Sequence, residues 1–144
     1  MQTMAVQLGG DANSAEKAEF GFAQVRARNH SELLKDISDE INSTGLGLLN
    51  VWMSHGIEVT ELPTNFNLIA STDNCPIAGF ANEEKHYYGL QFHPEVTHTK
   101  QGKAILECFV TSICKCKKNW TTENIIDCLL YTSPSPRDLS TSRM

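Results

Sequence analysis

The sequence predicts an α/β fold built on an open sheet that carries an antiparallel portion. Two observations lead to this prediction: short β-rich runs fill the middle of the chain, and segments with helical periodicity stand at both ends. The β-rich runs are separated by Asn, Asp, Pro and Gly, which favour the tight turns that join antiparallel strands. With 144 residues, 40% of them hydrophobic, the chain is long enough for one domain with a buried core.

The first predicted element is a helix over Met1–Leu8, where apolar residues recur at helical spacing and Gly9-Gly10 provides an end signal. No capping residue precedes this helix, so we expect that it belongs to a longer chain. Phe20–Val25 then predicts a strand, and the polar start of Ser31–Ile37 predicts a short helix. Further strands are predicted at Leu46–Met53, Phe66–Ala70, Ile77–Ala81 and Tyr87–Phe92.

The apolar period changes from about Lys100. Between Ile105 and Ile113 apolar residues follow three- and four-residue spacing, which predicts an amphipathic helix, and a second short helix is expected from Trp120 to Ile126. From Cys128 onward the chain is rich in Ser and Pro without apolar period, and residues 128–138 resemble a translated sequencing adapter. We therefore expect a partial domain over residues 1–127 and a non-native or naturally disordered tail over 128–144.

Composition excludes several classes of function. The formal net charge of −5 arises from 17 acidic and 12 basic residues without a long block, which is unlike a nucleic-acid-binding surface. No apolar stretch approaches the ~20 residues that span a bilayer, and no signal peptide is apparent, so we expect a cytoplasmic protein without membrane contact. The 5 cysteines lack paired spacing, which argues against a disulfide framework and against a metal site.

The most informative segment is Leu90–Thr99, which places His93 and Glu95 two positions apart at the end of an apolar run. In an extended segment such side chains point to the same side. A carboxylate beside an imidazole can accept its Nδ1 proton and stabilise the imidazolium that forms when the ring takes a proton from a nucleophile. The spacing is compatible with two members of a catalytic triad, although a histidine beside a carboxylate at the end of a strand is more often a surface ion pair.

Neighbouring segments strengthen the catalytic interpretation. The stretches concerned are Gln2–Leu8, Val51–Gly56, Ala81–Glu84, Tyr88–Thr99 and Gln101-Gly102. Together they resemble the class I glutamine amidotransferases, and within that family the glutaminase domains of the GMP synthetases. The resemblance implies a flavodoxin-like class I glutaminase sheet that here lacks its first strands.

The resemblance also implies a chemistry and a set of site residues. A cysteine attacks the side-chain amide of glutamine, a thioester forms, and ammonia passes to a synthetase domain that converts XMP to GMP with ATP. His93 matches the general base and acid, and Glu95 matches the residue that orients it. Gln2, Ser54 and Gly56 match positions that bind the substrate.

The chain departs from the family pattern at the nucleophile. The family's cysteine would fall three residues before Met1, and no internal cysteine stands in a comparable setting. A smaller departure is Ile57, where the family usually has Asp. We therefore expect a fragment of the glutaminase domain that is inactive by itself.

The implied partners are glutamine and an ATP-pyrophosphatase domain outside this chain, in a parent enzyme expected to be a homodimer. ATP and Mg²⁺ are implied for that absent domain, and no cofactor is expected in this fragment. The main alternative is a non-catalytic, glutamine-binding or regulatory subunit that has lost its nucleophile. An unrelated α/β hydrolase is disfavoured because no Gly-x-Ser-x-Gly elbow is present. His55 remains open between substrate contact and a backbone hydrogen bond.

Overall fold

The computed structural model describes residues 1–28, 30–117 and 126. Its elements are α1 (Gln2–Gln7), β1 (Asp11–Ala27), β2 (Glu40–Ile41), β3 (Gly47–Glu61), β4 (Asn67–Ser71), β5 (Gly79–Asn82), β6 (Tyr87–Leu90), α2 (Gly102–Glu107) and a π-helix, η1 (Cys108–Ile113). The strands form one sheet in the order β2-β3-β1-β4-β5-β6, and every pairing in the described part of the chain is antiparallel. The predicted α/β fold with an antiparallel portion is confirmed.

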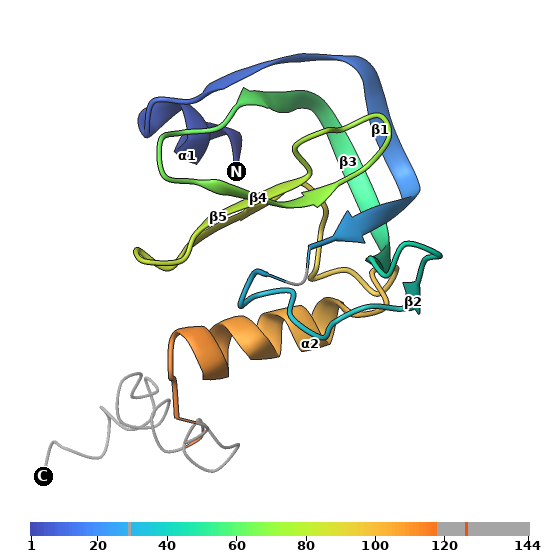
Figure 1. Cartoon of the computed structure of the whole chain (residues 1–144), viewed down its shortest axis with the longest axis vertical. Helices are drawn as coiled ribbons and strands as arrows, with labels where there is room; N and C mark the ends of the chain where they lie inside the picture. Colours follow the sequence, from blue (N-terminus) through green and yellow to red (C-terminus); the bar gives the residue numbers. More distant parts are fainter. Residues whose placement is uncertain (29, 118–125, 127–144) are drawn as a thin grey trace, which may run out of the picture.

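Strands β1 and β3 form the long ribbon that arches over β4 and β5 in Figure 1. Their register runs from the Asp11–Glu61 pair to the Ala27–Gly47 pair, with an irregularity between Ser14 and Glu19. An irregularity of this kind bends a strand and increases its twist. It therefore helps this ribbon to curl.

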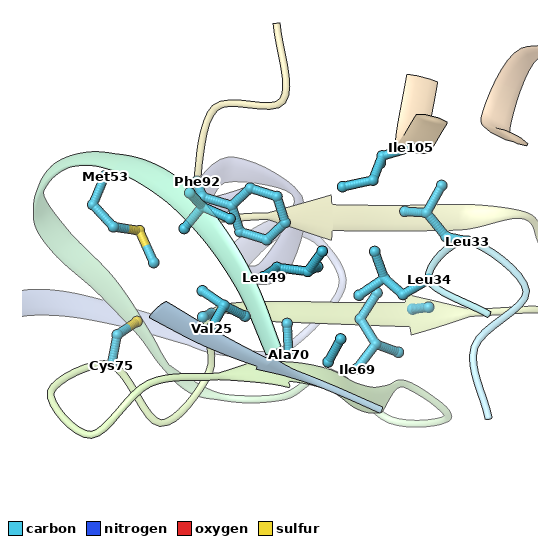
Figure 2. Close-up of a cluster of buried hydrophobic side chains, with 14 of the residues drawn as sticks. Val25, Leu33, Leu34, Leu49, Met53, Ile69, Ala70, Cys75, Phe92 and Ile105 are labelled. Atoms are coloured by element: carbon cyan, nitrogen blue, oxygen red, sulfur yellow. The ribbon is translucent and has the colours of Figure 1, made fainter. Parts of the chain in front are cut away.

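The main hydrophobic core lies between the concave face of the sheet and α2 (Figure 2). Strand β3 contributes alternate side chains, Leu49, Val51 and Met53, as the two-residue period of a strand requires. Other members of this cluster include Val25, Leu33, Leu34, Ile69, Ala81, Phe92 and Ile105. Each fully buried aliphatic side chain contributes about 1.5–3 kcal/mol by leaving water.

A smaller cluster buries helix α1 against the sheet. It contains Ala5, Val59 and Phe80, with Met4 packed against them. Phe80 and Ala81 are neighbours on β5 but belong to different clusters, because successive side chains of a strand point to opposite faces. Helices α1 and α2 consequently cover opposite faces of β5.

The predicted first helix is confirmed as α1, which ends before Gly9 at a φ of 92°. This left-handed conformation costs glycine little and terminates a helix. The predicted strands are all present with shifted bounds, and Phe20–Val25 is the central part of a much longer β1. Strand β3 likewise runs on past Met53 to Glu61.

The predicted helix over Ser31–Ile37 is wrong, because these residues form successive turns. The Ser31 hydroxyl accepts a hydrogen bond from the Leu33 N–H at 3.2 Å, and Asp36 adopts a φ of 59°. Side-chain bonds to nearby backbone compete with helix formation, and a left-handed residue interrupts it. Burial of Leu33 and Leu34 holds the segment on the core without a helix.

The predicted carboxy-terminal helix is present, but its second half is a π-helix. Bonds with a five-residue step appear there, including the Cys114 N–H to the Phe109 carbonyl at 2.9 Å. The second predicted helix, apart from Ile126, and the predicted tail lie outside the described residues. None of the described helices combines the length and apolarity needed to cross a membrane.

Candidate active site

The segment that carries His93 follows β6 directly and leaves the sheet as a turn. The predicted strand Tyr87–Phe92 ends at Leu90, so His93 and Glu95 do not lie on an extended strand. The His93 N–H donates to the Trp52 carbonyl at 3.0 Å, which ties the turn to the edge of β3. The two side chains therefore meet through a turn rather than through the strand spacing that predicted their proximity.

The His93 ring and the Glu95 carboxylate are in direct contact, with 2.7 Å between Nδ1 and Oε1. A hydrogen bond from its own backbone N–H, and then the His93 ring, hold the pKa of the Glu95 carboxyl below its usual range. An ionised Glu95 accepts the Nδ1 proton, which leaves Nε2 as the basic nitrogen of a neutral ring. The side chains are 40% and 60% exposed, so the pair is open to a ligand.

A cavity of about 400 Å³ opens beside this pair. Gln2, Ser54, His93 and Glu95 are among the residues that line it. Its volume falls within the range of small-molecule sites. Four of the five predicted site residues thus meet around one cavity, whereas Gly56 is not among its lining residues in the described part of the chain.

Gln2 is anchored by two hydrogen bonds from its side-chain amide. Nε2 donates to the Ile57 carbonyl at 2.9 Å and to Oε1 of Gln91 at 3.0 Å. Both N–H groups of the amide are therefore used within the protein, and its carbonyl oxygen is the atom left for a ligand. Ile57 takes part through its backbone, so the loss of the family's usual Asp there leaves these bonds intact.

Gln91 is a cavity residue that the sequence analysis missed. Its side chain is buried, and its Nε2 donates to the same Ile57 carbonyl at 2.8 Å. It connects α1, β3 and the segment after β6 at one point. Its place two residues before His93 was the only available signal.

Thr99 is a second missed residue. Its buried hydroxyl donates to the His93 carbonyl at 2.6 Å and accepts the Trp52 N–H at 3.1 Å. The ring of His98 packs on Trp52 with 4.5 Å between centroids. These contacts fix the backbone of His93 against β3, which is the kind of support that holds a catalytic side chain in place.

Gly102 supports the same turn from the start of α2. A Cβ atom at this position would collide with the carbonyl of Pro94, the residue between His93 and Glu95. Only glycine allows the helix to approach so closely. Gly102 therefore acts through packing, whereas Gln101, singled out with it in the sequence, donates from Nε2 to Oδ1 of Asp39 at 3.2 Å.

Ser54 and His55 point to opposite faces of β3. Ser54 is exposed, whereas His55 is buried and its Nε2 lies 3.4 Å from Oε2 of Glu19 on β1. His55 also lines the cavity, so a substrate contact stays a prediction, whereas neither ring nitrogen makes a hydrogen bond to the backbone of the described residues.

None of the four described cysteines lines the cavity. Cys75 is buried in the loop between β4 and β5, and burial, followed by the charges of Glu58 and Glu19, raises the pKa of its thiol to about 12. Cys108 donates to the Glu32 carbonyl at 3.4 Å, and Cys114 and Cys116 are exposed beyond η1. Cys128 lies outside the described residues.

Comparison with known proteins identifies relatives of this chain. The family model described as "Glutamine amidotransferase class-I" matches residues 1–113. The GMP synthase [glutamine-hydrolyzing] of Ruthia magnifica is 75% identical over 126 residues, covering 88% of this chain and 23% of the relative. That of Hydrogenovibrio crunogenus is 61% identical over 127 residues, covering 88% of this chain and 24% of the relative. The chain thus spans about a quarter of the length of these curated relatives.

Solved structures show the same fold. A protein from Thermoplasma acidophilum that is named as a GMP synthase subunit superposes with a TM-score of 0.70 at 31% identity, covering 79% of this chain and 53% of that one. A glutamine amidotransferase from Thermotoga maritima gives a TM-score of 0.55 at 20% identity, covering 99% and 51%. The second likeness concerns the fold alone.

Proposed function

This chain belongs to the class I glutamine amidotransferase family, and from that premise we propose that it forms part of the glutaminase site of a glutamine-hydrolysing GMP synthase. The observation that carries the proposal is the contact of 2.7 Å between His93 Nδ1 and Glu95 Oε1 at the edge of an open cavity. The high identity to GMP synthases over 126 residues supports the choice of enzyme.

In this proposal His93 is the general base and acid. Nε2 takes the proton of a cysteine thiol, the thiolate attacks the side-chain amide carbon of glutamine, and a tetrahedral oxyanion forms. The imidazolium then gives its proton to the leaving nitrogen, which departs as ammonia and leaves a thioester. Water, deprotonated by His93, hydrolyses the thioester to glutamate and returns the thiol. Glu95 stabilises the imidazolium at both steps.

The cysteine itself is proposed to come from residues that precede Met1 in the longer enzyme. Met1 lines the cavity that holds His93, so a residue shortly before it would enter the same space. The described cysteines line no part of that cavity. Within the cavity, the Gln2 carbonyl oxygen and the backbone of Ser54 are the proposed contacts to glutamine, and Gly56, which does not line the cavity, is proposed as a further contact only from the family resemblance.

The wider enzyme is also part of the proposal. Ammonia passes to an ATP-pyrophosphatase domain that converts XMP to GMP, and ATP and Mg²⁺ are held there. The described residues of this chain contain no group of three or more His, Cys, Asp or Glu side chains placed to hold a metal ion. We propose a cytoplasmic, homodimeric enzyme.

The test uses a chimera in which the 126 matched residues of this chain replace their counterpart in the Ruthia magnifica GMP synthase. The chimera should form GMP with glutamine as nitrogen donor. His93→Ala should lower this rate by about a hundredfold or more, because a general base is lost. GMP formation from added ammonium should remain unchanged and serves as the control. An unchanged glutamine-dependent rate in His93→Ala would remove His93 from the mechanism.

A second candidate is a glutamine-binding subunit without catalysis, and it is favoured by one observation, the lack of a described cysteine around the cavity. The two candidates differ at the codons before Met1 in the source genome. Codons for Gly-x-Cys-Tyr-Gly there would eliminate the binding subunit. A start signal directly before Met1 would eliminate the glutaminase.

A further inference from the structure

A second histidine–carboxylate pair lies at the cavity, where His55 is a lining residue and Glu19 is not. Glu19 on β1 and His55 on β3 are opposite each other in the strand register, and 3.4 Å separates Oε2 from Nε2. Their side chains are only 12% and 5% exposed. Polar side chains that leave water to this extent normally need several hydrogen bonds.

One oxygen of this pair is hydrogen-bonded, and its other polar side-chain atoms have no hydrogen-bond partner among the described residues. Oε1 of Glu19 accepts a bond from Nδ2 of Asn74 at 2.9 Å, in the loop between β4 and β5. Oε2 of Glu19 and both ring nitrogens of His55 have no hydrogen-bond partner among the described residues. Oε2 of Glu58 is buried and unpartnered as well. The approach of Glu19 Oε2 to Nε2 at 3.4 Å is therefore the polar side-chain contact that the described residues provide to this ring.

The pair stands at the point where the strand register is interrupted. Ser14 faces Ile57 and Glu19 faces His55, so residues 15–18 of β1 lie opposite Gly56 alone. The irregularity interrupts the pairing on one side of Gly56, and regular pairing resumes at Glu19 and His55. The Glu19–His55 pair is therefore the end of the regular ladder that lies next to the cavity wall.

We propose that Glu19 is a positioning residue for the glutamine cavity, which acts by holding the buried ring of His55 and thereby the strand segment from Ser54 to Gly56. This inference rests on the proposed function, since it concerns the same site. His55 lines the cavity between these two residues, so a displaced His55 ring shifts the wall that contacts the substrate.

The proposal separates substrate binding from chemistry. The His93–Glu95 contact is carried by the turn after β6, and β3 is tied to that turn at Trp52 by the His93 N–H and the Thr99 hydroxyl. Loss of Glu19 should therefore loosen β3 beyond Trp52 and leave the base and its orienter in place. KM for glutamine should rise while kcat changes little.

Two measurements test this. In the chimera with the Ruthia magnifica enzyme, Glu19→Ala should raise KM for glutamine about tenfold and change kcat less than twofold. Glu19→Gln keeps an oxygen for Asn74 and offers an N–H to a neutral His55, so it should restore most of the affinity. In the full chain itself, hydrogen exchange of the Ser54 and Gly56 amides should rise about tenfold in Glu19→Ala.

Glu61→Ala removes an exposed carboxylate from β3 and is the matched control, expected to change neither measurement. A lowered kcat with unchanged KM in Glu19→Ala would overturn the positioning role. Unchanged hydrogen exchange at the Ser54 and Gly56 amides would overturn it as well. A chimera that makes GMP from ammonium but not from glutamine would instead contradict the proposed function, whatever the exchange experiment shows.

Discussion

Two His–Glu pairs share this cavity wall and differ in their physical setting. His93 and Glu95 are close in sequence, 2.7 Å apart, and open to solvent. Glu19 and His55 come from different strands, are 3.4 Å apart, and are almost completely buried. The first pair forms a hydrogen bond, whereas the second leaves Glu19 Oε2 and both His55 nitrogens without a hydrogen-bond partner among the described residues.

The difference teaches what each environment permits. An exposed pair contributes little to stability, because water screens the charges, but its ring can exchange protons with a ligand. A buried pair is costly to desolvate and costly to break, so it acts on structure. In the two proposals, identical residue types thus serve chemistry in one place and position a strand in the other.

The largest expected effect concerns Cys75, which reports on the buried region. Its pKa is raised from 9.0 to about 12, mainly by burial and then by Glu58 and Glu19. This rise in pKa makes the thiolate fraction of Cys75 at a given pH about a thousandfold smaller than that of a thiol with the ordinary pKa of 9.0. Alkylation with iodoacetamide at pH 8, mapped by peptide mass spectrometry, should modify Cys75 about a thousandfold more slowly in the folded chain than in the urea-unfolded chain, and the exposed Cys114 and Cys116 serve as reactive controls. Rapid modification of Cys75 in the folded chain would contradict the burial of this region.

The next effect concerns the exposed pair. Glu95→Gln in the chimera should lower kcat for glutamine about a hundredfold or more, because a neutral amide cannot stabilise the imidazolium of His93. The melting temperature should hardly change, since the Glu95 side chain is 60% exposed. Glu19→Gln, the same substitution in the buried pair, should leave kcat for glutamine nearly unchanged. Similar kcat values for both variants would erase the distinction between the pairs.

The fold was predictable where apolar periodicity is strong. The predicted strand Leu46–Met53 supplies Leu49 and Val51 to the core, and the helical spacing from Ile105 places Ile105 and Ile113 there, whereas Leu106 and Val110 of the same predicted face are exposed. The segment Ser31–Ile37 was mistaken for a helix because its polar start resembles a helix amino terminus, whereas Asp36 adopts a left-handed backbone conformation and Leu33 and Leu34 are buried without a helix. Tertiary packing decided between turn and helix there.

Without the family resemblance, which supplied Gln2 and Ser54, the site was predictable only where its residues are close in sequence. The proximity of His93 to Glu95 follows from their spacing, although a turn rather than a strand brings them together. Glu19 could not be linked to His55 in advance, because their contact depends on the register of two distant strands and on a bulge. Thr99 and Gln91 were missed for the same reason, since their partners lie on β3.

A smaller expected effect concerns the free energy of unfolding, from which a double-mutant cycle gives the interaction energy within each pair. Glu19→Leu and His55→Leu should each cost about 2–3 kcal/mol, because each leaves a buried partner unpaired. The double variant should cost less than the sum of the two by about 1–2 kcal/mol. Urea unfolding of the full chain measures all three. The same cycle on His93→Ala and Glu95→Ala should give a coupling close to zero. Equal couplings would mean that burial does not separate the pairs.

The smallest effect is the pH dependence that Glu95 contributes. Its folded pKa lies below the ordinary value of 4.5, because its own backbone N–H and the His93 ring favour the ionised form. Its contribution to stability is therefore fully present above pH 4.5 and is lost as the pH falls through the lowered pKa. Thermal melts of the full chain and of Glu95→Gln should show a slight advantage for the unaltered chain at pH 6 that shrinks as the pH falls below 4.5. An advantage that grows on acidification would reverse the sign and contradict an ionised Glu95 beside His93.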